Sequence, residues 1–349
     1  MNIHEKYINR CIHIAKNGIG NTYPNPLVGS VIVLNNKIIG EGWHQKSGGH
    51  HAEVEAINDV SDKNLLRKAT IYVNLEPCSH FGKTPPCANL IIEKGIKKVV
   101  IGSLDPNPKV GGKGVKYLQD NGCEVVVGVL EKECLELNKR FFTVHIKNRP
   151  FVILKWGETK NGFIDEIRNE KSLKEPNWIS NVYSQQRVHK MRAEEQAILI
   201  GTNTALNDNP SLTVRSWFGK NPIRIVLDRQ LKIPSHYELY SGLVKTIFLT
   251  EKTPSFKLNE NVFFEELDFK SNVPQQICAI LLKHEIHSVI IEGGAKTLQT
   301  FINENCWDEA YKFVGNMVFE GGVKGPVLNI MPTKIEQISD DILNCYVNY

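Results

Sequence analysis

Two short stretches of the chain hold side chains of the types that can bind zinc and move protons. The first, "GGHHAEVEAIND", begins at Gly48 and places His51 two residues before Glu53, and the second, "EPCSHFGKTPPC", carries Cys78 and Cys87. Imidazole nitrogen and thiolate sulfur are common zinc ligands, and a site with three protein ligands keeps a position for water. Zinc lowers the pKa of such a water to about 7, and a glutamate outside the ligand set can move its proton. The two stretches therefore make a candidate hydrolytic zinc site.

The order of the two stretches is that of a known signature. H-x-E followed later by P-C-x-x-C is typical of zinc deaminases. Here "HAE" gives the first half and "PC" begins the second, but the longer loop "SHFGKTPP" separates Cys78 from Cys87. Cys87 follows two prolines, which favour the start of a helix, and the helix dipole stabilises a thiolate there. The helix pattern after Cys87 therefore suits an ionised ligand.

The residues alone leave alternatives open. "HAE" is also a common helix start with a solvent-exposed glutamate, and the thiols could be unrelated to it. If His50 or His80 filled the fourth position, the zinc would be structural, no water would be activated and Glu53 would be incidental. We expect His50 to line the pocket or face solvent, and Glu55, one turn beyond His51, to lie at the surface.

Strand and helix patterns alternate on both sides of these stretches. "GSVIVLNNKIIGEGW" predicts a hairpin turned at Asn35-Asn36, while "TIYVNLEP", "KKVVIGSL" and "CEVVVGVL" predict strands, with helical patterns between them. A new strand, "RPFVILKWG", begins after Pro150, and the theme repeats through "AILIGTNTALNDNP", "IRIVLDR" and "HSVIIEGGAKTLQTFINEN". We expect two α/β domains, 1–146 and 147–349, each with a mostly buried sheet.

Composition limits the class of protein. The chain has 349 residues, 41% hydrophobic and 23% charged, which is ordinary for two globular domains. No stretch approaches 18 apolar residues, and the first residues lack the apolar run of a signal peptide, so we expect a soluble cytoplasmic protein without a membrane partner. The net charge is +4, but Lys and Arg are mixed with acids, so no nucleic-acid partner is expected. The remaining cysteines are expected to be reduced and buried, namely Cys11, Cys123, Cys134, Cys278, Cys306 and Cys345.

Several motifs of the first half together carry a more specific resemblance. "YPNPLVGSVIV", "GEGWHQKSGGHHAEVEA", "LEPCSHFGKTPPC" and "DPNPKVGGKG" resemble the deaminase half of the bifunctional deaminase/reductase family of riboflavin biosynthesis. The long loop between the cysteines is normal in that family. The resemblance implies a cytidine-deaminase-like α/β/α domain with His51, Cys78 and Cys87 as zinc ligands and Glu53 as the proton shuttle. It also implies pocket residues that bind the substrate, namely Asn25, His44, Lys83 and Asp105.

The second half needs a site for a reduced nicotinamide cofactor if this resemblance holds. No G-x-G-x-x-G follows a strand there, so a Rossmann site is not expected. A buried strand, the diglycine Gly293-Gly294 and an amphipathic helix could instead hold a phosphate on backbone N–H groups. By itself this pattern is equally explained by tight packing at a turn.

The motifs of the second half resemble the reductase half of the same family, with a dihydrofolate-reductase-like fold. They are "RPFVILKWG", "NWIS", "HKMRAEEQAILIGTNTALNDNPSLTVR", "NPIRIVLD" and "IIEGGAKTL". The resemblance implies NADPH contacts at Trp178, Thr204, Asp208, Gly293, Gly294, Ala295, Lys296 and Thr297. It implies substrate contacts at Arg192, Leu212, Arg215 and Glu292, where the arginines suit a phosphate.

Two places depart from the family pattern. Where the family has K-x-x-x-S-x-D-G, this chain has Lys155, Thr159 and Asn161 before a glycine, and Pro176 stands where a small polar residue is common. The changes near Thr159 keep a hydroxyl and an amide.

The expected protein is a bifunctional enzyme. Its first domain would hydrolyse the 2-amino group of a diamino-ribosylaminopyrimidinone 5′-phosphate with zinc, and its second would reduce the ribosyl group to ribityl with NADPH. A deaminase acting on tRNA or free nucleosides is a rival that would need a basic patch and clustered aromatics, and a zinc-stabilised binding module is another. The resemblance implies a homo-oligomer, with a dimer favoured.

Overall fold

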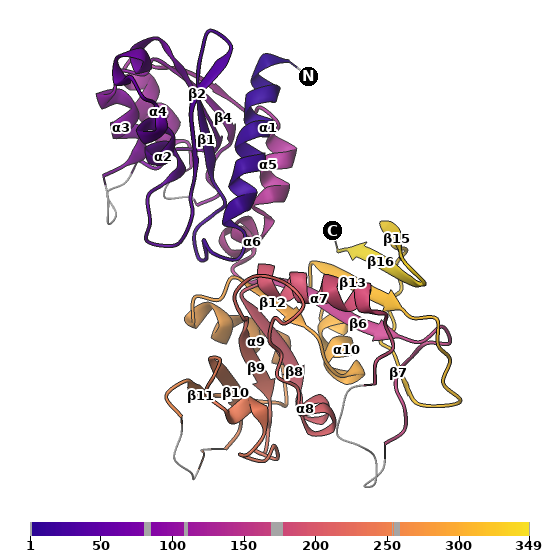
Figure 1. Ribbon diagram of the computed structural model, residues 1–349. Helices are drawn as coiled ribbons and strands as arrows, with labels where there is room; N and C mark the ends of the chain where they lie inside the picture. The colour runs from indigo at the N-terminus through magenta and orange to yellow at the C-terminus, as the bar shows by residue number, and fades with distance from the viewer. Residues whose placement is uncertain are drawn as a thin grey trace. The chain divides into compact units, whose positions relative to one another are not determined.

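The computed structural model describes residues 2–79, 85–107, 111–168, 177–252, 254 and 259–348. The chain divides into two compact units, Met1–Asn148 and Arg149–Tyr349, each with its own sheet (Figure 1). The division falls slightly after the predicted boundary because the last helix of the N-terminal unit, α6 (Lys139–Lys147), continues past residue 146.

The N-terminal unit is built on a five-stranded sheet. Its strand order is β2 (Lys37–Trp43), β1 (Gly29–Leu34), β3 (Thr70–Leu75), β4 (Lys98–Ser103) and β5 (Glu124–Val127). β1 is antiparallel to β2 and β3, while β3, β4 and β5 are parallel. The start of β1 and the carboxyl ends of β2, β3 and β4 therefore meet at one edge of the sheet. The predicted hairpin turn is confirmed at Asn35 and Asn36, whose φ angles of 48° and 61° suit a two-residue turn.

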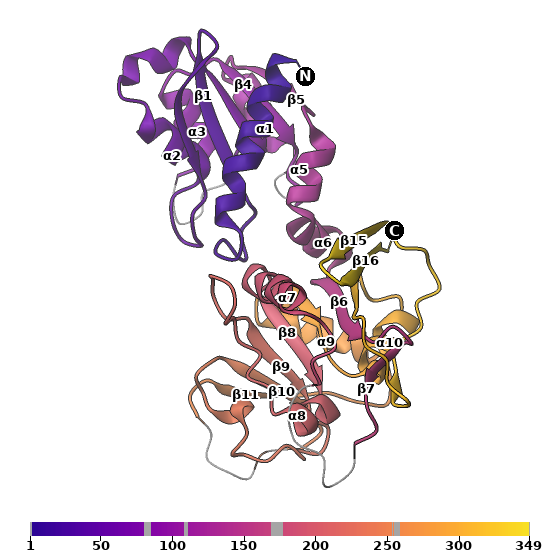
Figure 2. The same ribbon diagram turned by 45° about the vertical axis from the view of Figure 1, so that its right-hand side comes forward.

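Helices cover both faces of this sheet, so the unit has three layers (Figures 1 and 2). α1 (Ile3–Ala15) and α5 (Glu131–Leu137) pack on one face, and α2 (Ala52–Asp59), α3 (Cys87–Glu93) and α4 (Lys113–Asp120) pack on the other. Successive strand residues supply the two cores: Val31 and Tyr72 face α1, whereas Ile32 and Ile71 face α2 and α3. This alternation follows from the two-residue period of a strand.

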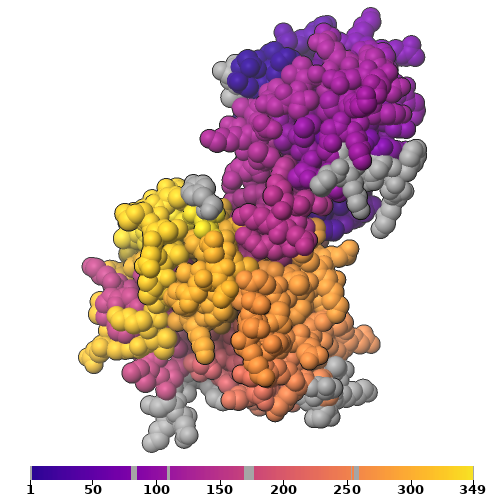
Figure 3. Space-filling model, turned by 180° about the vertical axis from the view of Figure 1, so that it is seen from behind, coloured from indigo at the N-terminus to yellow at the C-terminus, as the bar shows by residue number. Residues whose placement is uncertain are grey.

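The C-terminal unit contains a nine-stranded sheet. Its order is β11 (Val262–Glu266), β10 (Thr246–Thr250), β9 (Ile223–Leu227), β8 (Ala197–Gly201), β12 (Ser288–Ile291), β6 (Phe151–Glu158), β13 (Glu309–Val314), β16 (Asp341–Val347) and β15 (Lys334–Ile338). Every neighbouring pair from β11 to β13 is parallel, while β16 is antiparallel to β13 and β15. The yellow side of this unit in Figure 3 is formed by the C-terminal residues, which include β15 and β16.

Four helices enclose the parallel part of this sheet. α9 (Val273–Lys283) and α10 (Ala295–Asn303) pack on one face, and α7 (Val182–Glu194) and α8 (Thr202–Asp208) contribute to the core of the other. A separate two-stranded sheet joins β7 (Phe163–Asp165) to β14 (Val323–Lys324). The short helices η1 (Lys16–Gly18), η2 (Lys63–Lys68) and η3 (Glu238–Tyr240) complete the described elements.

Two expectations about the whole chain can be compared with the structure. All the cysteines are free, and those predicted to be buried are buried except Cys345, which is half-buried because it lies on β16, next to the edge strand β15. Across the described residues, no helix is long and apolar enough to cross a membrane.

Candidate active sites

The predicted metal ligands lie together at the edge of the N-terminal sheet. His51 is the N-cap of α2, Cys78 lies shortly after β3, and Cys87 is the first residue of α3, as the sequence predicts. The His51 Nδ1 atom lies 3.3 Å from Cys87 Sγ and 3.6 Å from Cys78 Sγ, and all three ligand atoms are within 4.8 Å of one another. A tetrahedral ion with ordinary Zn–N and Zn–S bonds separates N from S by about 3.5 Å. The three side chains therefore fit zinc.

The local backbone holds the two thiols in place. The amide of Cys87 donates to Cys78 Sγ at 3.3 Å, and the amide of Ala88 donates to the Cys78 carbonyl at 3.1 Å. The hydrogen bond from the Cys87 thiol, together with His51, lowers the pKa of Cys78 below its ordinary value. Zinc binds thiolates, so metal binding and loss of the thiol protons are linked.

Glu53 lies in the first turn of α2, within the same site. Its side chain is 3% exposed and has a hydrogen bond with Cys87. Burial, together with the negative charge of Cys78, raises the pKa of Glu53 to about 7. A carboxyl group that exchanges its proton near neutral pH suits a group that takes a proton from water and returns it.

The fourth coordination position has no protein ligand among the residues that the structure describes. The His50 side chain is exposed, and its Nδ1 lies 3.1 Å from Glu55 Oε1. Of the two predicted positions for His50, in the pocket or facing solvent, the structure shows the second. Glu55 is partly exposed, in agreement with its expected surface position. His80 and Lys83 lie outside the described residues. Three protein ligands among the described residues match a catalytic zinc site, which keeps its fourth position for water.

Two predicted pocket residues form a pair beside the ligands. His44 is 3% exposed, its ring lies across that of His51 at 5.7 Å, and its Nδ1 lies 2.8 Å from the carbonyl of His50. That carbonyl can only accept, so the proton is on Nδ1, and Nε2 accepts from the Asn25 amide at 3.0 Å. The pair keeps the Asn25 carbonyl oxygen available to accept from a substrate N–H.

Asp105 follows β4 at the same edge of the sheet. Its position depends on Glu76, a buried residue that sequence analysis did not select. The Glu76 carboxylate accepts from the amides of Asp105 at 3.1 Å, Gly112 at 2.9 Å and Val115 at 3.1 Å. Glu76, which directly follows β3, therefore connects the end of this strand to the loop that carries Asp105. Its place directly before "PC" was the only signal in the sequence.

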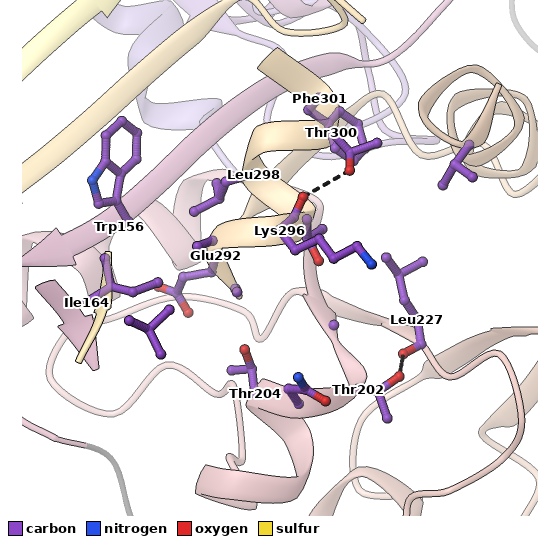
Figure 4. A pocket seen from close by; sticks show the side chains of 18 of the residues that line it. Trp156, Ile164, Thr202, Thr204, Leu227, Glu292, Lys296, Leu298, Thr300 and Phe301 are labelled. Carbon is purple, nitrogen blue, oxygen red and sulfur yellow. Dashed lines mark hydrogen bonds between the residues drawn. The ribbon is translucent and has the colours of Figure 1, made fainter. Parts of the chain in front are cut away.

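The C-terminal unit has a cavity of about 850 Å³ at the carboxyl ends of β6, β8, β9 and β12. This is where ligands bind in open α/β sheets, at the point where strand order reverses. The residues predicted for NADPH line this cavity (Figure 4), namely Thr204, Asp208, Gly293, Gly294, Ala295, Lys296 and Thr297. Trp178, the remaining residue of that set, is 56% exposed and does not line it.

Gly293, the first residue of the diglycine between β12 and α10, makes a close contact with Thr204 that a larger residue would crowd. A Cβ atom on Gly293 would lie 2.9 Å from Thr204 Oγ1 and 3.1 Å from its Cγ2. Gly294 has a φ of 52° and is the N-cap of α10. The first amides of a helix have no partner within it, so this turn can hold a phosphate.

Three ionic side chains converge beside the diglycine. The carboxylate of Glu292 lies 3.2 Å from Lys155 Nζ on β6 and 2.5 Å from Arg192 Nη2 on α7. Burial would raise the pKa of Glu292, but Arg192 and Lys155 outweigh it and hold the pKa at about 2. Glu292 is therefore an anion at neutral pH, and it fixes the two cations.

Arg192 and Arg215 are brought to one place, as expected for two residues that bind one phosphate. Arg192 Nη1 donates to the Thr213 carbonyl at 3.3 Å, and Arg215 Nη1 donates to the hydroxyl of the same Thr213 at 3.3 Å. Leu212 has a φ of 54° and its side chain packs in the core, so only its backbone is available to a ligand. The amide of Arg215 donates to His189 Nδ1 at 3.0 Å.

Asp208 belongs to a second ionic group on the cavity wall. Arg168 Nη2 lies 3.1 Å from Asp208 Oδ1 and Arg168 Nε lies 2.9 Å from Asp165 Oδ2. Burial raises the pKa of Asp208 to about 6, against the opposing effect of Arg168. Sequence analysis missed Asp165 and Arg168, which carry no recognisable spacing to Asp208.

The residues that depart from the family pattern have local roles in the turn between β6 and β7. Thr159 Oγ1 donates to Asn161 Oδ1 at 2.7 Å and accepts from the Phe163 amide at 3.0 Å. Asn161 Nδ2 donates to the Phe319 carbonyl at 2.7 Å. The hydroxyl and amide thus stabilise the turn, while Pro176 lies outside the described residues.

Comparison with known proteins covers both units. Residues 1–103 match the family model of the cytidine and deoxycytidylate deaminase zinc-binding region, and residues 150–343 match that of the RibD C-terminal domain. Riboflavin biosynthesis protein RibD of Aquifex aeolicus is 38% identical over 360 residues, which is 99% of both chains. The same protein of Synechocystis is 38% identical over 92% of this chain and 86% of its own.

Solved structures agree over the full length. A diaminohydroxyphosphoribosylaminopyrimidine deaminase/5-amino-6-(5-phosphoribosylamino)uracil reductase of Thermotoga maritima is 36% identical, covers 99% of both chains and has a TM-score of 0.89. RibD of Acinetobacter baumannii is 29% identical with the same coverage and a TM-score of 0.87. These similarities confirm the predicted pairing of a deaminase-like domain with a reductase domain.

Proposed function

The chain belongs to the RibD family of bifunctional riboflavin-biosynthesis enzymes, and on this premise we propose which residues perform its two reactions. The N-terminal unit deaminates 2,5-diamino-6-ribosylamino-4(3H)-pyrimidinone 5′-phosphate, and the C-terminal unit reduces the ribosyl group of the product with NADPH. The observation that carries the proposal is the set of three converging zinc ligands beside the buried carboxyl of Glu53.

In the deaminase site, His51, Cys78 and Cys87 hold zinc, which when bound supplies an acidified water. Glu53 takes a proton from the water that attacks C2 and passes it to the ring nitrogen, then carries the second proton of that water to the 2-amino group. The new C–O bond becomes the carbonyl as the C–N bond breaks and ammonia leaves. Asn25 binds the pyrimidine edge, and His44 fixes the orientation of its amide. Lys83 binds the ribose phosphate of the substrate, and Asp105 lines the pocket.

In the reductase site, the turn at Gly293 and Gly294 binds the cofactor phosphates, and NADPH when bound supplies the hydride. Arg192 and Arg215 bind the substrate phosphate through guanidinium forks. Glu292, which lines the cavity, orients Arg192 and Lys155 through its ion pairs with them. Thr204, Asp208 and Trp178 contact the cofactor.

The proposal is tested by NADPH oxidation with the diamino nucleotide as the only pyrimidine. We expect the wild type to consume NADPH, and Glu53→Gln to do so only with the deaminated nucleotide. Glu55→Gln, on the same helix and partly exposed, is the matched control and should behave as wild type. Deaminated product that accumulates without loss of NADPH would overturn the reductase assignment, and normal deamination by Glu53→Gln would overturn the role of Glu53.

We also propose a cytoplasmic location and a homo-oligomer, with a dimer favoured. The absence of a membrane-spanning helix among the described residues supports the first. Exposed apolar side chains near the C-terminus support the second, among them Val318, Val327, Met331 and Ile335. Light scattering of the purified protein tests the oligomeric state, and a monomer mass would contradict the proposal.

A further inference from the structure

Two buried asparagines from distant parts of the N-terminal unit hold one loop segment between them. Asn74 lies on β3 and is fully buried, and Asn138 lies where α5 ends and α6 begins and is 2% exposed. Both form hydrogen bonds with the backbone of Leu27, shortly before β1. We call Asn74 and Asn138 the asparagine clamp. The proposed deamination uses neither side chain, so a role in it has to come from the segment that they hold.

The asparagine clamp binds both polar groups of the Leu27 backbone. Asn138 Oδ1 accepts from the Leu27 amide at 2.8 Å, and its Nδ2 donates to the Leu27 carbonyl at 2.9 Å. Asn74 Nδ2 donates to the same carbonyl at 3.0 Å, and its Oδ1 accepts from the Gly29 amide at 2.7 Å. An amide side chain offers a donor and an acceptor side by side, as the backbone of a neighbouring strand does. Leu27 is therefore fixed by four hydrogen bonds on this short segment, although it lies outside the sheet.

Little conformational freedom separates Leu27 from Asn25, two positions earlier. Pro26 lies between them, and its ring locks φ at about −65° and also restricts the residue before it. On the other side of Leu27, Gly29 packs so closely against α1 that a Cβ atom there would overlap the Cys11 carbonyl. The segment has no room to shift toward α1, so the asparagine clamp sets the position of Asn25.

The same segment also holds His44, the partner of Asn25. The backbone amide of His44 donates to the Val28 carbonyl at 2.9 Å, and His44 Nε2 accepts from the Asn25 side chain at 3.0 Å. A displacement of the segment would therefore move both members of the pair together. The zinc ligands and Glu53 would stay in place, because they belong to α2, α3 and the loop after β3.

We propose that Asn138 is a positioning residue for deamination, which holds the Leu27 backbone so that Asn25 meets the pyrimidine edge, and which does not itself touch the substrate. The inference rests on the proposed function of Asn25 and adds the residue that keeps it in place. Because Asn25 binds the ring and takes no part in proton transfer, loss of the asparagine clamp should weaken substrate binding more than the chemical step. KM should rise while kcat changes little.

The test measures steady-state deamination by the full-length protein without NADPH, so that the reaction stops at the deaminated nucleotide. Asn138→Ala removes both hydrogen bonds to Leu27 and should raise KM for the diamino nucleotide about tenfold, as for loss of one hydrogen bond to the substrate. We expect kcat to change less than about threefold and the zinc content to stay that of the wild type. Ser30→Ala is the matched control, because it removes a buried hydrogen bond to the Tyr72 carbonyl on β3. It should lower the unfolding temperature and leave KM unchanged.

A double-mutant cycle separates a positioning role from a merely structural one. If Asn138 acts through Asn25, Asn25→Ala should raise KM by itself, and Asn138→Ala should then raise it by less than about a further twofold. Asn138→Ser keeps a hydroxyl near the Leu27 backbone and should raise KM less than Asn138→Ala. The serine variant also takes the place of the alanine variant in the cycle if the latter does not fold.

The outcomes separate the inference from the proposed function. If Asn138→Ala lowers the unfolding temperature as Ser30→Ala does but leaves KM unchanged, the asparagine clamp is only structural and the inference is wrong. The inference is also wrong if the effects of Asn138→Ala and Asn25→Ala on KM multiply as independent changes. If Asn25→Ala alone leaves KM unchanged, the proposed role of Asn25 fails and the inference fails with it. A wild type that does not deaminate would overturn the proposed function itself.

Discussion

At the scale of single residues, a buried histidine lies beneath the arginines of the reductase site. His189 is 5% exposed and accepts from the Arg215 amide through Nδ1. Burial and the positive charges of Arg192 and Arg215 lower its pKa to about 4. His189 is therefore neutral in the folded protein at pH 7, and it adds no charge beside the two arginines that we propose bind phosphate.

This shift predicts a pH dependence of stability. Between the unfolded pKa of about 6.5 and the folded pKa of about 4, the unfolded chain binds more protons, so stability falls as pH falls. His189→Asn keeps an acceptor for the Arg215 amide but does not titrate. We expect its unfolding temperature to fall less than that of the wild type between pH 7 and pH 5. His236→Asn, at an exposed position, is the control, and equal losses in all three proteins would contradict the prediction.

A second prediction at this scale concerns the metal ligands. Cys87→Ser removes one of the two thiolates, and we expect the purified protein to lose most of its zinc, measured by elemental analysis. Cys123→Ser changes a buried thiol outside the site, which donates to the Ile96 carbonyl, and should keep about one zinc per chain. Equal zinc contents in the two variants would show that Cys87 is not a ligand.

At the scale of elements, α8 contacts the Gly293-Gly294 turn that precedes α10. This contact holds the shape of the turn, which we propose binds the cofactor. Gly293→Ala places a methyl group against Thr204, and such overpacking costs about 1–3 kcal/mol. We expect weaker binding of NADPH and a lower unfolding temperature. Adding Thr204→Ala removes the crowded atoms, so the loss in the double variant should be smaller than the sum of the single losses.

The control for this junction is Gly321→Ala, where a Cβ would meet no atom within 4 Å. It should match the wild type in both measurements. Additive losses in the double variant would indicate that the two elements are not coupled through this contact.

Individual strands and helix starts could be predicted from the sequence, whereas contacts between distant segments could not. Strands such as β1 and β8, and the helix starts at His51 and Cys87, follow from local periodicity and turn residues. The pairing of β7 with β14 joins segments far apart in the chain, and neither strand is long enough to have a period. The salt bridges of Glu292 likewise depend on which strands and helices become neighbours. Family resemblance, rather than spacing, supplied the reductase residues.

At the scale of the whole molecule, each unit has its own core and its own chemistry. The cores of the N-terminal unit and those of the C-terminal unit share no residue. The first residue after the division, Arg149, forms a bidentate ion pair with Asp308 of its own unit. Metal binding stabilises only the unit that holds the ligands.

We therefore expect residues 1–148 and 149–349 to fold as separate fragments. Fragment 1–148 should bind zinc and deaminate, and fragment 149–349 should bind NADPH and reduce the deaminated nucleotide. A chelator should abolish deamination and lower the unfolding temperature of the first fragment, yet leave NADPH binding and the unfolding temperature of the second unchanged. Circular dichroism and the two separate assays check this. Loss of reduction on chelation, or failure of fragment 149–349 to fold, would show that the reductase depends on the zinc-bearing unit for its structure.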